Sequence, residues 1–275
     1  MSRNGMRSAA NAGKWNSYAH SEAEGPMTAK LFIHGVPDSP AIWRPLIAAL
    51  DLGDTPVAVP ALPGFTAPLP AGFAPTKEAY ADWAAAQVEA LHAAHGPIDI
   101  VGHDWGALIA QRVAMLRPDL LRSWAISNAV IDPDYRGHRI ARIWNTPVLG
   151  EIFMALSRAD KLADGLAAQG MPADIAREEA EQWKNRDKRR AILKLYRSAK
   201  GLSFEHDWAL DIPKLPANGA LIWGEGDPYV ELSVARRYAA NTGTPLTVIE
   251  GAGHWAIAER PAELAAALHA FWNGL

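Results

Sequence analysis

Residues 101–106 read Val101-Gly102-His103-Asp104-Trp105-Gly106, and this stretch decides the fold. A short apolar run, residues 98–101, precedes it, and a segment of helical composition, residues 107–116, follows it. A residue held between close-packed glycines at a strand-to-helix junction is typical of a nucleophile elbow, which raises one side chain on a tight turn. That position is usually a serine, and here it is Asp104.

The pattern around the elbow predicts an alternating α/β fold. Apolar runs predict strands before it and after it, and segments with helical periodicity separate them. This alternation predicts a mostly parallel sheet with helices on both faces. The expected strands are residues 29–33, 56–59, 98–101, 121–127, 220–223 and 246–249, and the expected helices are residues 41–50, 76–95, 107–116, 231–240 and 262–272.

The alternation is interrupted once. Residues 131–210 contain helical segments and no convincing strand, which predicts an all-helical cap above the sheet's C-terminal edge, where such folds place their sites. The remaining segments, residues 15–130 and 211–275, form the expected core domain. A dense charge run within the cap, residues 177–190, is interpreted as a solvated helix face.

The composition excludes several classes of function. The chain has 275 residues, of which 49% are hydrophobic, and a net charge of -3, so nucleic acid is not an expected partner. It contains no cysteine, which excludes disulfides and a thiolate nucleophile. No apolar run reaches the roughly 18–20 residues of a membrane span, and residues 1–14 read as a loose tail before Trp15. We expect a soluble, cytoplasmic protein without a membrane partner, and homo-oligomer formation stays open.

Two further strand ends carry the partners that Asp104 needs. Asp227 follows one predicted strand and His254 follows the next, each in a glycine-flanked loop. The order nucleophile, acid, histidine is the one associated with a strand-turn-helix elbow. Each residue alone has an ordinary structural explanation: Asp227 as a turn former, His254 as a buried structural histidine and Asp104 as a helix cap. Together they predict a catalytic triad.

These motifs resemble those of the α/β-hydrolase superfamily, in the branch that contains epoxide hydrolases and haloalkane dehalogenases. The resemblance runs from about Trp15 to the C-terminus and rests on His34-Gly35-Val36-Pro37, the aspartate elbow, Asp227 and Gly253-His254. It implies an α/β-hydrolase fold with the cap inserted after the sixth strand. It also implies that the backbone N–H groups of Val36 and Trp105 form an oxyanion hole.

A carboxylate in the elbow predicts the chemistry. It is suited to displacement at a saturated carbon, which gives an alkyl ester of Asp104. His254 then activates water to attack this ester, and Asp227 orients the imidazole. The reaction needs no metal and no organic cofactor.

The leaving group separates two activities. An epoxide oxygen needs a proton, and the cap tyrosines Tyr196 and Tyr135 are candidate donors. Leu195-Tyr196-Arg197 resembles the tyrosine motif of epoxide hydrolase caps, and within the branch the sequence resembles these enzymes most. A haloalkane dehalogenase is the alternative: Val36 lacks the side-chain donor usual there, so a second N–H would come from Trp144, Trp183 or Trp208. A non-catalytic ligand-binding protein and an ester or lactone hydrolase stay open.

The large apolar residues near the motifs suggest a lipophilic small-molecule substrate. Such residues are more often ordinary core, so their place at the site is a hypothesis that the structure can test. The candidate substrate-binding residues are Phe65, Trp105, Trp144, Phe153, Met154 and Trp255.

Overall fold

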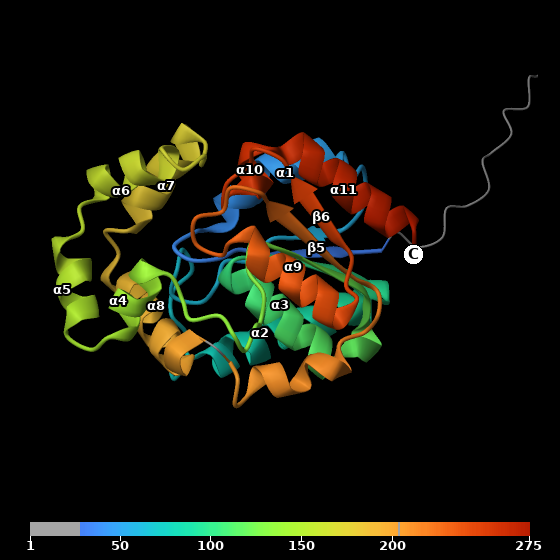
Figure 1. The fold of residues 1–275 in the computed structure, drawn as a ribbon, viewed down its shortest axis with the longest axis horizontal. Helices are drawn as coiled ribbons and strands as arrows, with labels where there is room; N and C mark the ends of the chain where they lie inside the picture. The colour runs from blue at the N-terminus through green and yellow to red at the C-terminus, as the bar shows by residue number, and fades with distance from the viewer. Residues whose placement is uncertain (1–27, 203) are drawn as a thin grey trace, which may run out of the picture.

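The computed structural model describes residues 28–202 and 204–275, which form a parallel sheet covered by helices on both faces (Figure 1). The expected loose tail, residues 1–14, and the expected start at Trp15 lie outside the described residues. The sheet has six strands in the order β2-β1-β3-β4-β5-β6. They are β1 (Lys30–Ile33), β2 (Val57–Ala58), β3 (Ile98–His103), β4 (Leu121–Ser127), β5 (Gly219–Gly224) and β6 (Leu246–Ile249).

Two hydrophobic clusters hold the layers together, one on each face of the sheet. Successive strand residues alternate between them: Leu31 and Ile33 belong to the first cluster and Phe32 to the second. The first cluster is covered by α2 (Lys77–His95), α3 (Trp105–Leu116) and α9 (Leu232–Thr242). The second is covered by α1 (Arg44–Leu50), α10 (Ala256–Glu259) and α11 (Pro261–Asn273). Short 3₁₀ helices lie at η1 (Pro40–Trp43) and η2 (Pro118–Leu120).

The order of the strands sets the position of the site. The chain runs from β1 outward to β2 and then returns to the other side of β1 as β3, so the direction of winding reverses between β1 and β3. Ligands of open α/β sheets bind beyond the carboxyl ends of the strands at such a reversal. The loop after β1 and the elbow after β3 therefore lie side by side.

A helical cap interrupts the sheet between β4 and β5 and forms a layer of its own (Figure 1). Within the described residues it follows the fourth strand, β4, and two strands, β5 and β6, come after it; the predicted position after a sixth strand is not tested, because residues 1–27 lie outside the described residues. None of the described helices combines the length and the hydropathy of a bilayer span. The cap contains α4 (Arg139–Asn145), α5 (Leu149–Leu156), α6 (Ala159–Ala167), α7 (Ala173–Gln182), α8 (Arg186–Ser198) and η3 (Lys200–Leu202). The next element, η4 (Trp208–Lys214), packs against α3 of the core.

The charge run of the cap is only partly a solvated helix face. Glu179 of α7 and Lys188 of α8 have fully buried side chains and form an ion pair of 3.1 Å. The hydroxyl of Ser39, which belongs to the core, donates to the same glutamate. For these two residues the solvated interpretation is wrong, because they pair with each other where the cap meets the core.

Candidate active site

Asp104 stands on a strained turn between β3 and α3. Its backbone has φ 50° and ψ -124°, which lifts its side chain out of the strand and away from the helix that follows. The flanking glycines permit this turn: a Cβ atom at Gly102 would overlap the carbonyl of Gly106, and one at Gly106 would overlap the carbonyl of Ile33. The elbow predicted from residues 101–106 is therefore present, and its glycines serve close backbone packing.

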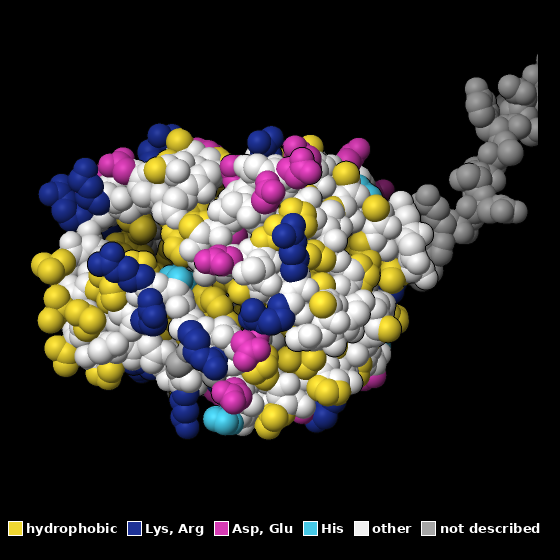
Figure 2. Space-filling model, in the orientation of Figure 1, with side chains coloured by type: hydrophobic (Ala, Val, Ile, Leu, Met, Phe, Trp, Pro, Cys, Tyr) yellow, Lys and Arg dark blue, Asp and Glu magenta, His cyan; other side chains and the backbone are white. Residues whose placement is uncertain are grey.

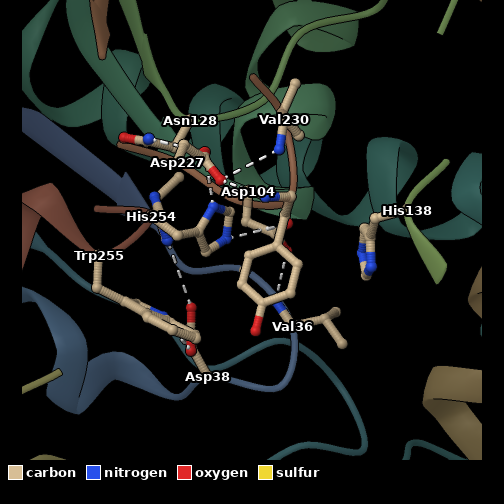
Figure 3. Close-up of polar contacts among 12 residues, drawn as sticks. Val36, Asp38, Asp104, Asn128, His138, Asp227, Val230, His254 and Trp255 are labelled. Carbon is tan, nitrogen blue, oxygen red and sulfur yellow. Dashed lines mark hydrogen bonds and ion pairs between the residues drawn. The ribbon is translucent and has the colours of Figure 1, made fainter. Parts of the chain in front are cut away.

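Three strand ends bring Asp104, Asp227 and His254 together (Figure 3). His254 Nδ1 lies 2.9 Å from Asp227 Oδ2, and His254 Nε2 lies 3.6 Å from Asp104 Oδ2. Asp227 thus contacts one ring nitrogen of the imidazole, while the other ring nitrogen faces the carboxylate of Asp104. The arrangement is compatible with a triad in which Asp104 is the candidate nucleophile.

Asn128 is a member of the site that the sequence did not reveal. It follows β4, and its Nδ2 donates to Asp227 Oδ2 at 2.8 Å. The backbone N–H groups of Tyr229 and Val230 donate to the other oxygen of Asp227 at 2.8 and 3.1 Å. The one signal in the sequence is an asparagine directly after a buried strand, where its φ of 58° is tolerated. These donors fix the carboxylate that orients His254.

The buried charges of the triad sustain one another. Burial alone would lower the pKa of His254, but the carboxylates of Asp227 and Asp104 outweigh it and raise the pKa from 6.5 to about 10. Burial alone would raise the pKa of the Asp104 and Asp227 carboxyl groups. The interaction with His254 more than offsets this, so both pKa values lie below the ordinary 3.8. At neutral pH the site therefore holds an imidazolium between two carboxylates.

One of the two N–H groups predicted for an oxyanion hole contacts Asp104. The backbone N–H of Val36 donates to Asp104 Oδ1 at 2.8 Å. This approach requires a glycine next to Val36, because a Cβ atom at Gly35 would overlap the Asp104 side chain. Trp105 opens α3 directly after the nucleophile, and the role of its backbone N–H stays a prediction.

A second buried acid lies beneath the triad. Asp38 Oδ1 accepts a hydrogen bond of 3.1 Å from the indole of Trp255, and Oδ2 lies 3.7 Å from Nε2 of His103. Burial, with the nearby charges of other carboxylates, raises the pKa of Asp38 to about 8. Burial lowers the pKa of His103 to about 3. Burial thus favours the uncharged form of both groups beneath the triad.

A cavity of about 290 Å³ opens above Asp104 and His254 between the core and the cap. Figure 2 shows the hollow, lined with hydrophobic side chains, between the cap helices. Its walls include Trp144, Phe153 and Trp255, as predicted. Apolar walls around a few charged groups are typical of a small-molecule site.

Two predicted wall residues lie elsewhere. Phe65 is fully buried and packs edge-on against His34, with ring centroids 5.5 Å apart. Met154 is buried within the cap, where its carbonyl accepts a hydrogen bond from Arg189. Neither residue lines the cavities that contain Asp104. Both predictions were wrong for the same reason, since a large apolar residue near a motif is more often core.

Tyr196 reaches the site from α8. Its ring packs against Trp105 and Trp144, with centroids 5.2 and 4.9 Å apart, and it lines the cavity together with Asp104. Burial and the charge of Asp104 raise the pKa of its hydroxyl well above 10, while a hydrogen bond from Trp105 acts in the opposite direction. The hydroxyl therefore keeps its proton at neutral pH, in the cavity that Asp104 also lines.

The hydroxyl of Tyr135, a predicted proton donor, is hydrogen-bonded to the backbone. Its hydroxyl donates to the carbonyl of Tyr229 at 3.0 Å and accepts from the backbone N–H of His138 at 3.1 Å. The proton is thus committed to the backbone. His138 and Tyr229 line the cavity instead, and neither was predicted, because only the fold of the loops before α4 and after β5 turns them toward Asp104.

Among the described residues the site offers indole donors for a halide but no cluster of ligands for a metal ion. Within residues 28–202 and 204–275, no three histidine, aspartate or glutamate side chains gather in a way that could hold a metal ion. Trp144 and Trp183 line the main cavity, and their buried indole N–H groups have no hydrogen-bond partner in the described part of the chain. Trp208 stacks on Phe204 and lines neither cavity that contains Asp104, so it cannot serve as the second halide donor.

Comparisons with known proteins agree with the fold. A model of the alpha/beta hydrolase family matches residues 31–267. A curated relative, an (E)-2-((N-methylformamido)methylene)succinate hydrolase of Acinetobacter baylyi, is 25% identical over 93% of this chain and 94% of its own. An epoxide hydrolase structure from Vigna radiata is 18% identical, covers 92% of this chain and 93% of its own, and has a TM-score of 0.74. A haloalkane dehalogenase structure from Bradyrhizobium elkani is 19% identical over 92% of this chain and 93% of its own, with a TM-score of 0.69.

Proposed function

The chain belongs to the alpha/beta hydrolase family, and from that premise we propose that it hydrolyses lipophilic epoxides to vicinal diols through an ester on Asp104. One observation carries the proposal: a carboxylate, not a serine, stands on the elbow, and it shares its cavity with the protonated hydroxyl of Tyr196. A carboxylate can displace a leaving group from a saturated carbon. The ring carbons of an epoxide are saturated, and the ring oxygen that leaves needs a proton.

The first step forms the ester. An oxygen of Asp104 attacks a ring carbon, the carbon–oxygen bond of the ring breaks, and the departing oxygen takes the proton of Tyr196. The Asp104 charge disappears, so one of the two carboxylates that raise the pKa of His254 is lost. The imidazolium then releases its proton, which replaces the one that Tyr196 gave.

The second step cleaves the ester. Neutral His254 takes a proton from water, and the hydroxide attacks the carbonyl carbon of Asp104. The Val36 N–H stabilises the negative oxygen that develops there, since it already donates to this carboxylate. The bond between the carbonyl carbon and the product oxygen breaks, this oxygen takes the proton of the added hydroxyl group, and the diol leaves. His254 is again an imidazolium beside the Asp104 carboxylate, so the cycle closes without a net exchange of protons with solvent.

A single turnover in water enriched in heavy oxygen tests this route. With enzyme in excess over styrene oxide, the label should enter the peptide that contains Asp104 and not the diol, because water attacks the enzyme ester. Asp104→Asn should form no diol. Label in the diol during the first turnover, or full activity of Asp104→Asn, would overturn the covalent mechanism.

Haloalkane dehalogenation is the second candidate. The unpartnered indole N–H groups of Trp144 and Trp183 favour it, because a departing halide is stabilised by such donors. The absence of a side-chain donor at Val36 weighs against it. Incubation with 1-bromobutane measures bromide directly: bromide release without diol from styrene oxide would replace the epoxide assignment. Tight binding of both compounds with no product would instead favour a ligand-binding protein.

A further inference from the structure

Two cavities of unequal size meet at Asp104. The main cavity has a volume of about 290 Å³, and a second cavity of about 30 Å³ lies toward α3. Three residues line both of them: Asp104, His138 and Tyr196. The reacting carbon must contact Asp104, so it lies at this junction, and its substituents extend into one cavity or the other.

His138 brings a hydrogen-bond donor to the junction. Its Nδ1 accepts the backbone N–H of Ala141 at 3.3 Å, as the cap of α4. Burial lowers its pKa to about 4, so the ring is neutral at neutral pH and its single proton lies on Nε2. His138 and His254 lie on opposite sides of Asp104 in Figure 3. The junction therefore offers two neutral donors, the hydroxyl of Tyr196 and the Nε2–H of His138, on the cap side of the nucleophile.

The sizes of the cavities limit what each can hold. A cavity of about 150 Å³ accepts benzene, and about 10–15 Å³ accepts one water. The main cavity is therefore large enough for an aryl or alkyl arm, whereas the small one admits hydrogen, a methyl group or a water or two. The small cavity does not serve the hydrolytic water, since His254 lines only the main cavity.

We infer that the substrate is a terminal epoxide with a single apolar arm, an inference that rests on the proposed function. The arm occupies the main cavity, the unsubstituted ring carbon faces the small cavity, and the ring oxygen lies between Tyr196 and His138. An epoxide with a bulky group on each carbon does not fit, because its second group would need the space taken by Trp105, Leu108 and Val230.

Substrate size tests the assignment. Diol formation from styrene oxide, with one aryl arm, is compared with that from trans-stilbene oxide, with two. We expect kcat/KM to favour styrene oxide by at least about 100-fold, since a group that overfills a pocket is strongly rejected. Leu108→Ala enlarges the small cavity and should reduce this preference at least tenfold. The matched control Leu162→Ala enlarges only the main cavity and should leave the preference unchanged.

The outcomes separate this inference from the proposed function. Similar kcat/KM for both epoxides, or equal effects of Leu108→Ala and Leu162→Ala on their ratio, would overturn the single-arm substrate while leaving epoxide hydrolysis intact. No diol from any epoxide would refute the proposed function and the substrate class with it. If Leu108→Ala does not fold, Leu108→Val provides a smaller enlargement of the same cavity and should shift the ratio in the same direction.

The donor role of His138 has its own pair of variants. His138→Phe and His138→Gln both lose the ring nitrogen that caps α4, so they share any structural cost. Only His138→Gln keeps an N–H near the position of Nε2. We expect kcat for styrene oxide to fall about 10- to 100-fold in His138→Phe and to recover in part in His138→Gln, since a donor to a developing negative oxygen acts mainly on kcat. Equal kcat in the two variants would refute the donor role.

Discussion

Replacing Lys188 by methionine tests a fully buried charge pair between the cap helices α7 and α8. Lys188 and Glu179 have side chains with no exposed surface, and Nζ lies 3.1 Å from Oε2. The ammonium also lies 5.7 Å from the ring centre of Phe65. Methionine conserves most of the side-chain length, so the change removes the charge with little loss of packing volume. It leaves the carboxylate of Glu179 buried without its cation.

The expected cost follows from this loss of compensation. Breaking a buried ion pair by removing one partner costs about 3–5 kcal/mol, because the remaining charge is desolvated and unpaired. We expect Lys188→Met to lower the free energy of unfolding by about this amount. The double variant Lys188→Met/Glu179→Gln removes both charges and keeps an oxygen that can accept the hydroxyl of Ser39. It should regain most of the lost stability.

Urea denaturation followed by tryptophan fluorescence measures these differences. Lys184→Met is the matched control, because Lys184 pairs with Glu181 at 2.6 Å in the same segment but both side chains are more than half exposed. Exposed pairs contribute little, so this control should unfold close to the unsubstituted protein. If Lys188→Met is as stable as Lys184→Met, or if the double variant is less stable than Lys188→Met, the reasoning from the buried pair is refuted.

Three further predictions concern the triad and its surroundings. Asn128→Ala removes a side-chain donor to Asp227, so kcat for diol formation should fall about tenfold or more, since a hydrogen bond to a charged group contributes about 1.5–3 kcal/mol; an unchanged kcat would contradict this role. Gly35→Ala places a methyl group against the side chain of Asp104, so diol formation should be largely lost while circular dichroism still reports a folded chain. The raised pKa of His254 stabilises the fold fully below pH 6.5, and this contribution is lost as the pH rises to about 10. The midpoint of thermal unfolding should therefore fall across that range, and it should fall less in His254→Gln.

The sequence predicted that the three candidate triad residues lie together, because parallel strands end at one edge of the sheet. Asp104, Asp227 and His254 each follow a buried strand, so the predicted strands alone placed them together. The strand at residues 121–127 was predicted with the bounds that the structure shows. Periodicity and strand ends can be read from a few neighbouring residues, and they determine much of this fold.

The residues that were missed depend on contacts between segments far apart in the chain. Asn128 acts through Asp227, and His138 faces Asp104 only because the cap folds back over the core. Tyr135 has the residue type of a proton donor, yet its hydroxyl donates a hydrogen bond to a carbonyl 94 residues away. Phe65 is a large apolar residue of the kind that lines cavities, yet it lies in the core. No local pattern distinguishes these outcomes, since each is decided by packing across the sheet edge.

The loop after β1 has a consequence for attempts to exchange parts between related enzymes. Within four residues it supplies the Val36 N–H that contacts Asp104 and the Ser39 hydroxyl that contacts Glu179 of the cap. One short segment thus contacts both the cap and Asp104, so a change in the position of the cap changes the contacts of Asp104. A cap transplanted from a relative without a matching partner for Ser39 would shift that segment, so cap grafting requires the loop to be transplanted with it.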